Sequence, residues 1–310
     1  KQTGNKEDTE KERGDIMAEN NTKELDFDRK HEEDLQRLRG LRLLDDDFMQ
    51  KVFEDKACTE LLLQIILKRA DLKVLHVNGQ QDIKNLQGRS VTLDILAVDT
   101  DNKVYNIEIQ RSDKGAAVKR ARYNSSLIDS NVTEPGEQYE NLCESYIIFI
   151  TENDIMKEGL PIYHVDRTVI ETGKLFGDEA HIIYVNSQIH DESALGKLMY
   201  DFYCTDAGKM NYEILADRVR YFKEDERGVE IMCREMEIMR NQAHEEGIEK
   251  GRIMQLIKQV CVKMQKFSSA EEVANDLVEQ DVPLIQKIMN VAPDFAPDYN
   301  VNDIYNALKL

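Results

Sequence analysis

Residues 93–111 read L-D-I-L-A-V-D-T-D-N-K-V-Y-N-I-E-I-Q-R, and they are the most informative stretch of this chain. Apolar and polar residues alternate on both sides of the run 99–103, which is made of turn-forming residues. This pattern predicts a hairpin of two antiparallel strands, 91–98 and 104–110.

The register of this hairpin brings two acidic residues together. If the hairpin folds about Asp101, the numbers of facing residues sum to 202, and Asp94 then faces Glu108. Opposed Cβ atoms lie about 4.5–5.5 Å apart, so the two carboxylates repel each other unless a cation lies between them. An oxygen-rich site of this kind suits Mg²⁺ or Mn²⁺, which keep several waters and accept a phosphate oxygen.

Gln110 follows Glu108 by two residues and points to the same face of its strand, where its amide can orient an attacking water. Spacing alone leaves a second interpretation open, in which Asp94 and Glu108 form a solvated face or pair with nearby Arg or Lys. Both acids stand among apolar neighbours, and burying a carboxylate without a partner is costly. This apolar setting favours a metal site more strongly than the spacing alone does.

The flanking segments predict an α/β core. The aspartates at 45–47 precede an apolar helical pattern, which predicts one helix ending near Arg69. A second helix is expected over 114–129, with its inner face formed by Ala117, Ala121 and Ile128. Further strands are predicted over 73–77, 145–151 and 181–186. Because 145–151 is apolar on both faces, we expect it to lie parallel to the hairpin after a helical crossover.

The composition is that of a globular protein, with 41% hydrophobic and 33% charged residues among 310. No apolar run approaches the roughly 20 residues needed to cross a bilayer, and no secretory signal is recognised, so a cytoplasmic location without membrane contact is expected. The five cysteines are scattered without a C-x-x-C pair, and the six histidines are equally dispersed. This argues against both a disulfide framework and a zinc site.

The net charge of −19 is unfavourable for binding DNA phosphates. The charge is unevenly distributed, however. Residues 84–123 contain eight Lys or Arg against five acids, and two of those acids are the proposed metal ligands. A DNA-binding surface therefore remains compatible with the sequence.

Three blocks carry a resemblance to a known family: L-D-I-L-A-V-D at 93–99, N-I-E-I-Q-R-S at 106–112 and K-R-A-R-Y-N-S-S-L-I-D at 119–129. They resemble the PD-(D/E)XK nuclease superfamily, and more closely its recombination-promoting nuclease or putative transposase branch. The likeness extends over roughly residues 40–250. It implies a restriction-endonuclease-like αβββαβ core with a mixed sheet, followed by a helical C-terminal region.

The resemblance also implies roles for individual residues. Asp94 and Glu108 would bind the metal, and Glu60 on the first helix would approach the same site. Arg122 and Tyr123 on the crossover helix would contact DNA phosphate or brace the site.

The chain departs from the motif at two positions. Leu93 stands in place of the proline, and Gln110 stands where many members have the catalytic lysine. An ammonium positions water and stabilises negative charge, whereas an amide only forms hydrogen bonds. The candidates for the missing positive charge are Arg111, Lys114 and Lys119.

The leading hypothesis is a DNA endonuclease that uses one or two divalent metals, in a recombination or mobile-element context, with a homodimer compatible with cutting both strands. A second hypothesis is a degenerate nuclease fold that binds DNA or a protein partner without turnover. A third is a structural or regulatory protein, which predicts that Asp94 and Glu108 are well exposed and apart. Phosphate-loop, dinucleotide-binding and nucleophile-elbow motifs are all missing from the sequence.

The expected domain organisation has three parts. Residues 1–40 form a charged leader, disordered or loosely ordered; 41–194 form the nuclease core; and 195–310 form a helical region. Within the last part, S-S-A-E at 268–271 has the spacing of a capping box that opens a helix. Packed helices are the favoured interpretation of 229–266, and a helical oligomerisation arm is the alternative.

Overall fold

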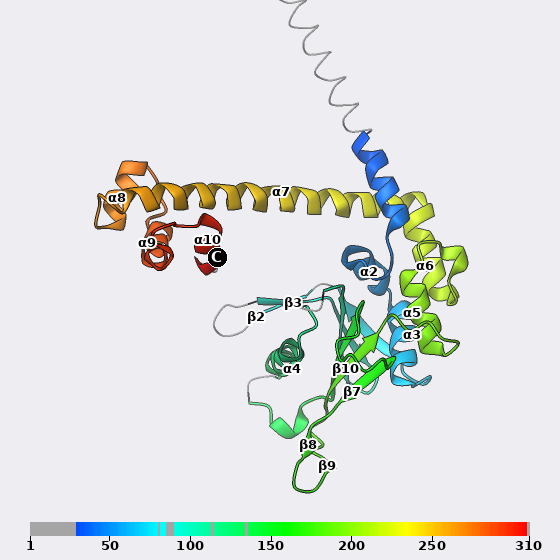
Figure 1. Ribbon diagram of the computed structural model, residues 1–310. Helices are drawn as coiled ribbons and strands as arrows, with labels where there is room; N and C mark the ends of the chain where they lie inside the picture. The colour runs from blue at the N-terminus through cyan, green and yellow to red at the C-terminus, as the bar shows by residue number, and fades with distance from the viewer. Residues whose placement is uncertain (1–28, 80, 85–89, 113–114, 134–135, 309–310) are drawn as a thin grey trace, which may run out of the picture. The chain divides into compact units, whose positions relative to one another are not determined.

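The computed structural model describes residues 29–308 apart from 80, 85–89, 113–114 and 134–135 (Figure 1). The strands are β1 (Val74–Asn78), β2 (Gln81–Lys84), β3 (Ser90–Leu93), β4 (Ile95–Asp99), β5 (Val104–Gln110), β6 (Ser145–Thr151), β7 (Ile162–Val165), β8 (Thr168–Val169), β9 (Lys174–Leu175) and β10 (Ala180–Asn186). The helices are α2 (Asp46–Phe53), α3 (Lys56–Leu67), α4 (Val118–Val132), α5 (Ala194–Tyr203), α6 (Glu213–Glu224), α7 (Glu226–Lys263), α8 (Ala270–Leu277), α9 (Val282–Val291) and α10 (Val301–Leu308).

A mixed six-stranded sheet in the order β1-β4-β5-β6-β10-β7 forms the centre of the fold. Its middle strands β5, β6 and β10 are parallel, while β1, β4 and β7 pair antiparallel with their neighbours. The chain reaches β6 from β5 through α4, as expected for a crossover. The predicted α/β core with a mixed sheet is therefore confirmed.

The hairpin has the predicted register, because β4 and β5 pair from Ile95↔Ile107 to Val98↔Val104, and each pair sums to 202. The first strand is interrupted, however. Asp94 lies between β3 and β4, and β3 leaves the sheet to pair with β2. The Asp94 side chain accepts the backbone N–H of Ile109 at 3.1 Å. The Asp94 carboxylate thus replaces a strand carbonyl as the acceptor for this N–H group of β5, at the point where β3 leaves the sheet.

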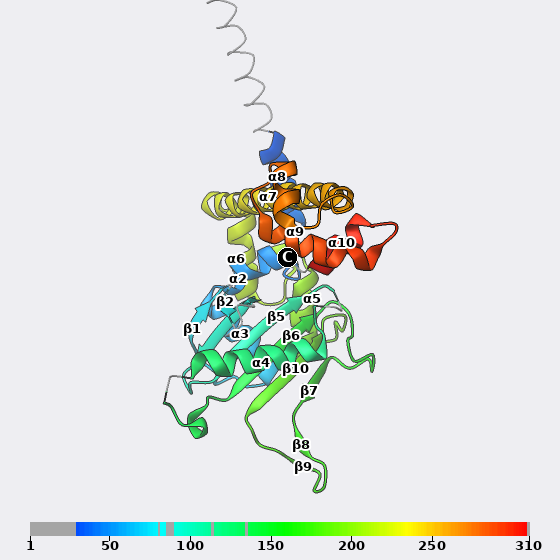
Figure 2. The same ribbon diagram turned by 90° about the vertical axis from the view of Figure 1, so that its left-hand side faces the viewer.

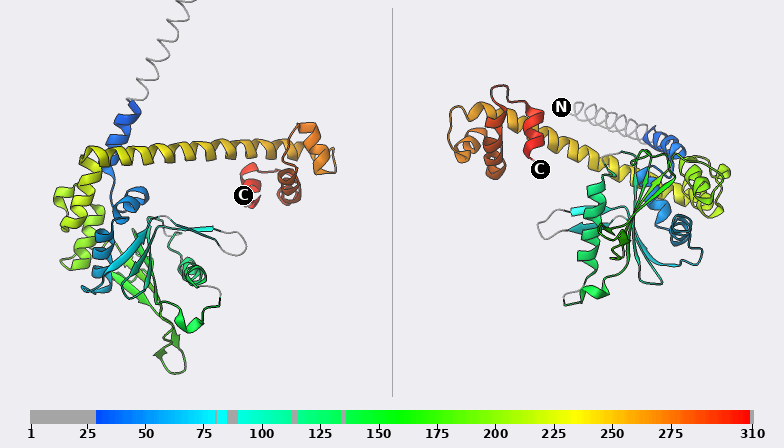
Figure 3. Two further views of the ribbon diagram at one scale, coloured as in Figure 1. Left: turned by 180° about the vertical axis from the view of Figure 1, so that it is seen from behind. Right: turned by 60° about the horizontal axis from the view of Figure 1, so that its bottom comes forward.

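The two faces of the sheet are covered by different helices (Figures 2 and 3). One face packs against α4, where Ala121 and Ile128 meet the sheet residues Ile147, Phe149 and Tyr184. Helices α2, α3 and α5 lie on the other side (Figure 1). Since side chains alternate along a strand, Asn106, Glu108 and Gln110 of β5 all point to the α4 face.

The single helix predicted to end near Arg69 is two helices. The Asp55 side chain accepts the backbone N–H groups of Ala57 (2.9 Å) and Cys58 (3.1 Å) and so caps a new helix, α3. The crossover helix also differs from the expectation: α4 begins at Val118, and Ala117 is an exposed N-cap residue rather than part of the inner face.

The chain divides into two compact units, residues 1–235 and 236–310. The first unit holds the sheet together with α5 and α6, so the helical region predicted from residue 195 contributes to both units. The second unit has its own core, in which Ile257 and Val260 of α7 pack with Val273 and Ile285. Its α8 opens with a capping box at Ser269 and Glu272, one residue later than predicted.

The predicted leader is partly described. Residues 29–40 are helical, and residues 1–28 lie outside the described part. No helix in the described part of the chain is long and apolar enough to span a membrane.

The Asp55 cap provides a test of the helix break. We expect Asp55→Ala to lower the free energy of unfolding by about 1 kcal/mol, because two N–H groups at the start of α3 lose their acceptor. Asp55→Asn keeps a capping oxygen and should lose much less. Chemical denaturation of both variants measures this difference. An equal loss of unfolding free energy in the two variants would show that the Asp55 cap does not define the break between α2 and α3.

Candidate active site

Two carboxylates from the hairpin meet on the α4 face of the sheet. Glu108 of β5 has 0% of its surface exposed, and Asp94 at the break before β4 is half-buried. The third hypothesis expected both acids to be well exposed and apart. The structure contradicts this hypothesis, because Glu108 is buried and lies close enough to Asp94 for the two negative charges to repel each other.

Glu108 is held by hydrogen bonds to both of its oxygens. Its Oε1 accepts the amide of Asn106 at 3.0 Å, and its Oε2 accepts the guanidinium of Arg120 at 2.8 Å. Arg120 also donates to the backbone oxygen of Gly115 at 3.0 Å, which fixes its guanidinium between α4 and the loop that precedes it. The carboxylate therefore has a defined orientation, with one neutral and one charged donor.

These partners do not fully offset the cost of burial. Burial, followed by repulsion from Asp94, raises the pKa of Glu108 to about 7, although Asn106 and Arg120 act in the opposite direction. Burial also raises the pKa of Asp94 to about 6; the charge of Asp46 adds to this, and the Ile109 N–H and Arg120 oppose it. Such a pair is far more stable as two carboxylates when a cation is beside it.

The donor atoms suit a hard divalent cation, because both side chains offer carboxylate oxygens. Across the described residues, no three His, Cys, Asp or Glu side chains form a group that could hold a metal. A cation at this site would therefore have two carboxylates of the described residues beside it, those of Asp94 and Glu108. Mg²⁺ commonly accepts such a site, with water and substrate oxygens completing its coordination.

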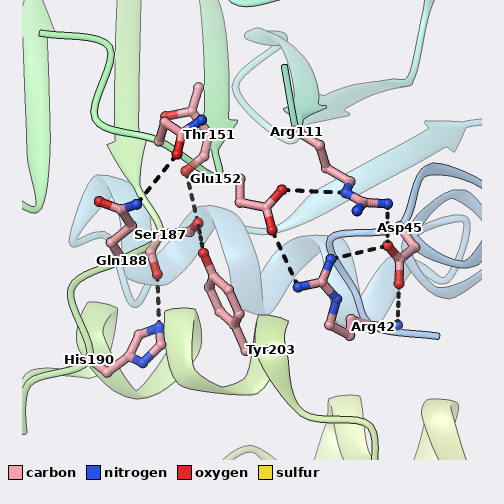
Figure 4. Close-up of polar contacts among 10 residues, drawn as sticks. Arg42, Asp45, Arg111, Thr151, Glu152, Ser187, Gln188, His190 and Tyr203 are labelled. Carbon is pink, nitrogen blue, oxygen red and sulfur yellow. Dashed lines mark hydrogen bonds and ion pairs between the residues drawn. The ribbon is translucent and has the colours of Figure 1, made fainter. Parts of the chain in front are cut away.

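Asp46 in the first turn of α2 is the third acid that acts on this site, through its effect on the pKa of Asp94. Its helix is anchored by four ion-paired residues, which we name the α2 anchor: Arg42, Asp45, Arg111 and Glu152 (Figure 4). Arg111 binds Asp45 at 2.9 Å and Glu152 at 3.4 Å, and Arg42 reaches both acids at 3.3 Å. The α2 anchor thus joins the start of α2 to the ends of β5 and β6.

Glu60, expected at the metal site, is placed elsewhere. Its carboxylate binds Lys73 at 2.7 Å and the backbone N–H of Val74 at 3.0 Å, at the start of the edge strand β1. Although burial opposes it, these contacts hold the pKa of Glu60 below its usual value. None of its described partners belongs to the site, and Glu60 lies on α3 while Asp46 lies on α2.

Gln110 lies on the α4 face beside Gly115. If residue 115 had a side chain, its Cβ atom would lie 1.8 Å from the amide oxygen of Gln110, which is a steric clash. A glycine is therefore needed for this side chain to keep its position. Of the predicted DNA-binding residues on α4, Lys119 and Arg122 are exposed, and Tyr123 packs against the sheet. Lys114 lies outside the described residues.

Sequence reasoning missed Asp46, Asn106, Arg120 and Asn124. Asn106 and Asn124 are both fully buried, with Asn124 donating to Asn106 at 3.4 Å. A signal was present for two of them: Arg120 and Asn124 are four residues apart, beside the inward-facing Ala121 and Ile128. Asp46 carried no such signal, because acidic residues are common at helix starts for electrostatic reasons alone.

Comparison with known proteins identifies a family for the part of the chain that contains this site. The model of a family described as PD-(D/E)XK nuclease family transposase matches residues 48–208, which include Asp94, Glu108 and the whole of α4. No curated protein and no solved structure matches the chain.

The raised pKa values predict how stability depends on pH. A carboxyl with a higher pKa in the folded than in the unfolded state binds more protons when folded, so stability is lost as pH rises. For Asp94 and Glu108, this loss of stability is expected between about pH 4 and about pH 7. Because a tenfold change in proton affinity is worth about 1.4 kcal/mol, we expect the pair without metal to cost on the order of 3–6 kcal/mol across this pH range.

Glu108→Gln removes one of these two titrating carboxyls. In EDTA, its free energy of unfolding should therefore fall less steeply as pH rises, as measured by chemical denaturation at several pH values. Mg²⁺ should stabilise the wild type but not this variant, because only the wild type has both carboxylates. Asp71→Asn, at an exposed acid of the same unit, is the control and should keep the wild-type decline. A Glu108→Gln variant with an undiminished decline would show that other groups cause it.

Proposed function

The chain belongs to the family of PD-(D/E)XK nuclease family transposases, and from this premise we propose that it is a divalent-metal-dependent DNA endonuclease. The observation that carries the proposal is the buried Glu108 beside Asp94, with the pKa of each carboxyl raised. An acid enclosed at such cost in a central strand, next to a second acid, is typical of a catalytic cation site. The proposed substrate is DNA in a recombination or mobile-element context in the cytoplasm.

In this proposal Asp94 and Glu108 hold Mg²⁺ or Mn²⁺. The bound ion would lower the pKa of a water and offset negative charge on the phosphate. Gln110 orients the attacking water with its amide, and Gly115 leaves room for that side chain. Asp46 adds negative charge beside Asp94, and the α2 anchor holds its helix in place.

The DNA backbone is proposed to run along α4, where Lys119 and Arg122 are exposed. Arg111 is assigned to the α2 anchor rather than to DNA, because both of its described ion pairs are with acids of the protein. Tyr123 is a brace between α4 and the sheet. A homodimer would bring two such sites to the two strands of a duplex.

Gln110 supports a second candidate function, a DNA-binding protein with the nuclease fold but without turnover. An amide has no charge with which to stabilise the transition state. The two candidates differ in whether the purified protein cuts DNA when a divalent metal is present.

Plasmid nicking with Mg²⁺, Mn²⁺ or EDTA tests the nuclease. We expect metal-dependent cutting by the wild type and at least about 100-fold slower cutting by Asp94→Asn and by Glu108→Gln, since each removes a metal ligand. Asp101→Asn, in the exposed turn of the same hairpin, is the control and should cut like the wild type. Cutting that survives in EDTA would refute the proposal, and DNA binding without any cutting would favour the second candidate.

The third acid of the site can be identified by comparing Asp46→Asn with Glu60→Gln. The structure predicts that Asp46→Asn raises the Mg²⁺ concentration needed for half-maximal cutting by roughly tenfold, because a nearby negative charge is lost. Glu60→Gln should leave that concentration unchanged. The reverse result would assign the role to Glu60 and require α3 to move.

A further inference from the structure

Replacement of the usual lysine by Gln110 leaves the proposed nuclease without a cation on β5. Negative charge develops on the phosphate during hydrolysis, and a positive side chain placed there contributes strongly to the rate. Sequence alone nominated Arg111, Lys114 and Lys119. In the structure, Arg111 is engaged in the α2 anchor and Lys119 is exposed, while Lys114 lies outside the described residues.

Within the described part of the chain, Arg120 is the cation that forms an ion pair with one of these carboxylates, that of Glu108. Its Nη2 lies 2.8 Å from Oε2 of Glu108, and its side chain remains 33% exposed, so it lies between the buried acid and solvent. Its charge acts on both metal-binding acids, since it favours the ionised form of Asp94 as well as that of Glu108. Its Nη1 is bound to the oxygen of Gly115, the residue that also adjoins Gln110.

Arg120 and a divalent cation compete for one carboxylate. A second cation on Glu108 withdraws negative charge from the ion pair, which weakens the hold on the guanidinium. Guanidinium groups bind phosphate oxygens through two parallel hydrogen bonds, so a DNA phosphate beside the acids offers Arg120 a better partner. The Gly115 contact keeps the guanidinium near the site during this exchange.

We propose that Arg120 is a further catalytic residue: it neutralises Glu108 before a cation binds, then transfers its guanidinium to the scissile phosphate and supplies the charge that Gln110 lacks. This inference rests on the proposed nuclease function. A purely structural role for the Arg120–Glu108 pair would differ in one respect. Loss of a structural brace weakens metal binding and cutting together, whereas loss of a competing cation strengthens metal binding while cutting slows.

The test compares Arg120→Gln with Arg69→Gln, a control that removes an arginine of similar exposure whose described ion pairs are with Asp71 and Asp101. Mn²⁺ affinity without DNA is measured by calorimetry, and single-turnover cutting is measured at saturating metal. For Arg120→Gln we expect Mn²⁺ to bind roughly threefold tighter, because a competing charge is gone, and cutting to slow by about 100-fold. Arg69→Gln should keep the wild-type Mn²⁺ affinity and cutting rate, because its described ion pairs are with acids outside the site.

Two further variants extend the test, and the first of them also covers the case in which Arg120→Gln fails to fold. Arg120→Lys keeps the charge without the two-pronged geometry and should cut roughly tenfold slower, with wild-type Mn²⁺ affinity. Gln110→Lys combined with Arg120→Gln restores a cation to β5 and should recover at least about tenfold of the lost rate.

The outcomes separate this inference from the proposed function. A wild type that neither binds Mn²⁺ nor cuts would overturn both. A wild type that cuts, with Arg120→Gln cutting equally fast or binding Mn²⁺ more weakly, would overturn the role of Arg120 alone. Failure of Gln110→Lys to recover cutting in a folded double variant would also overturn it.

Discussion

The buried carboxylate of Glu108 is the constraint around which this site is arranged. Strand β5 is paired on both sides, with β4 and β6, so its backbone cannot move to expose the side chain. The charge must therefore be offset where it lies. Asn106 and Arg120 each satisfy one oxygen, while Asp94, at the break between β3 and β4, adds a second negative charge nearby. The contacts leave a remaining electrostatic cost that a cation is suited to remove.

The α2 anchor illustrates a second use of charge. Two arginines and two acids form alternating ion pairs, so the group is electrically balanced and binds its own elements rather than an anion. Individual pairs at this degree of exposure contribute little to stability, but a network of four fixes geometry. It sets the position of α2, and through it the position of the Asp46 charge near Asp94.

Local pattern was sufficient for the turn and the register of the hairpin, but not for the break of its first strand at Asp94. The turn 99–103 is short, so it leaves little freedom in register, and the observed pairs have the predicted sum of 202. Alternation then placed Glu108 and Gln110 on one face. The strand 145–151 could also be predicted, since its apolar run requires burial on both faces. These features depend on residues adjacent in the chain or joined by one turn.

The partners of the acids were decided by long-range packing. Arg120 and Arg122 are about 200° apart around a helix, so which one faces Glu108 depends on the rotation of α4 against the sheet. Packing of Ala121 and Ile128 sets that rotation; the apolar spacing indicated their face, but only the packed structure shows that Arg120 reaches Glu108. Likewise, Asp46 acts on Asp94 whereas Glu60 is bound to Lys73 and Val74 at β1, and the sequence did not distinguish these two positions. The amino-acid sequence by itself determined which acidic and amide side chains the hairpin carries. The tertiary structure decided which distant charges lie beside them, because the cost of burying a charge depends on how all the elements pack together.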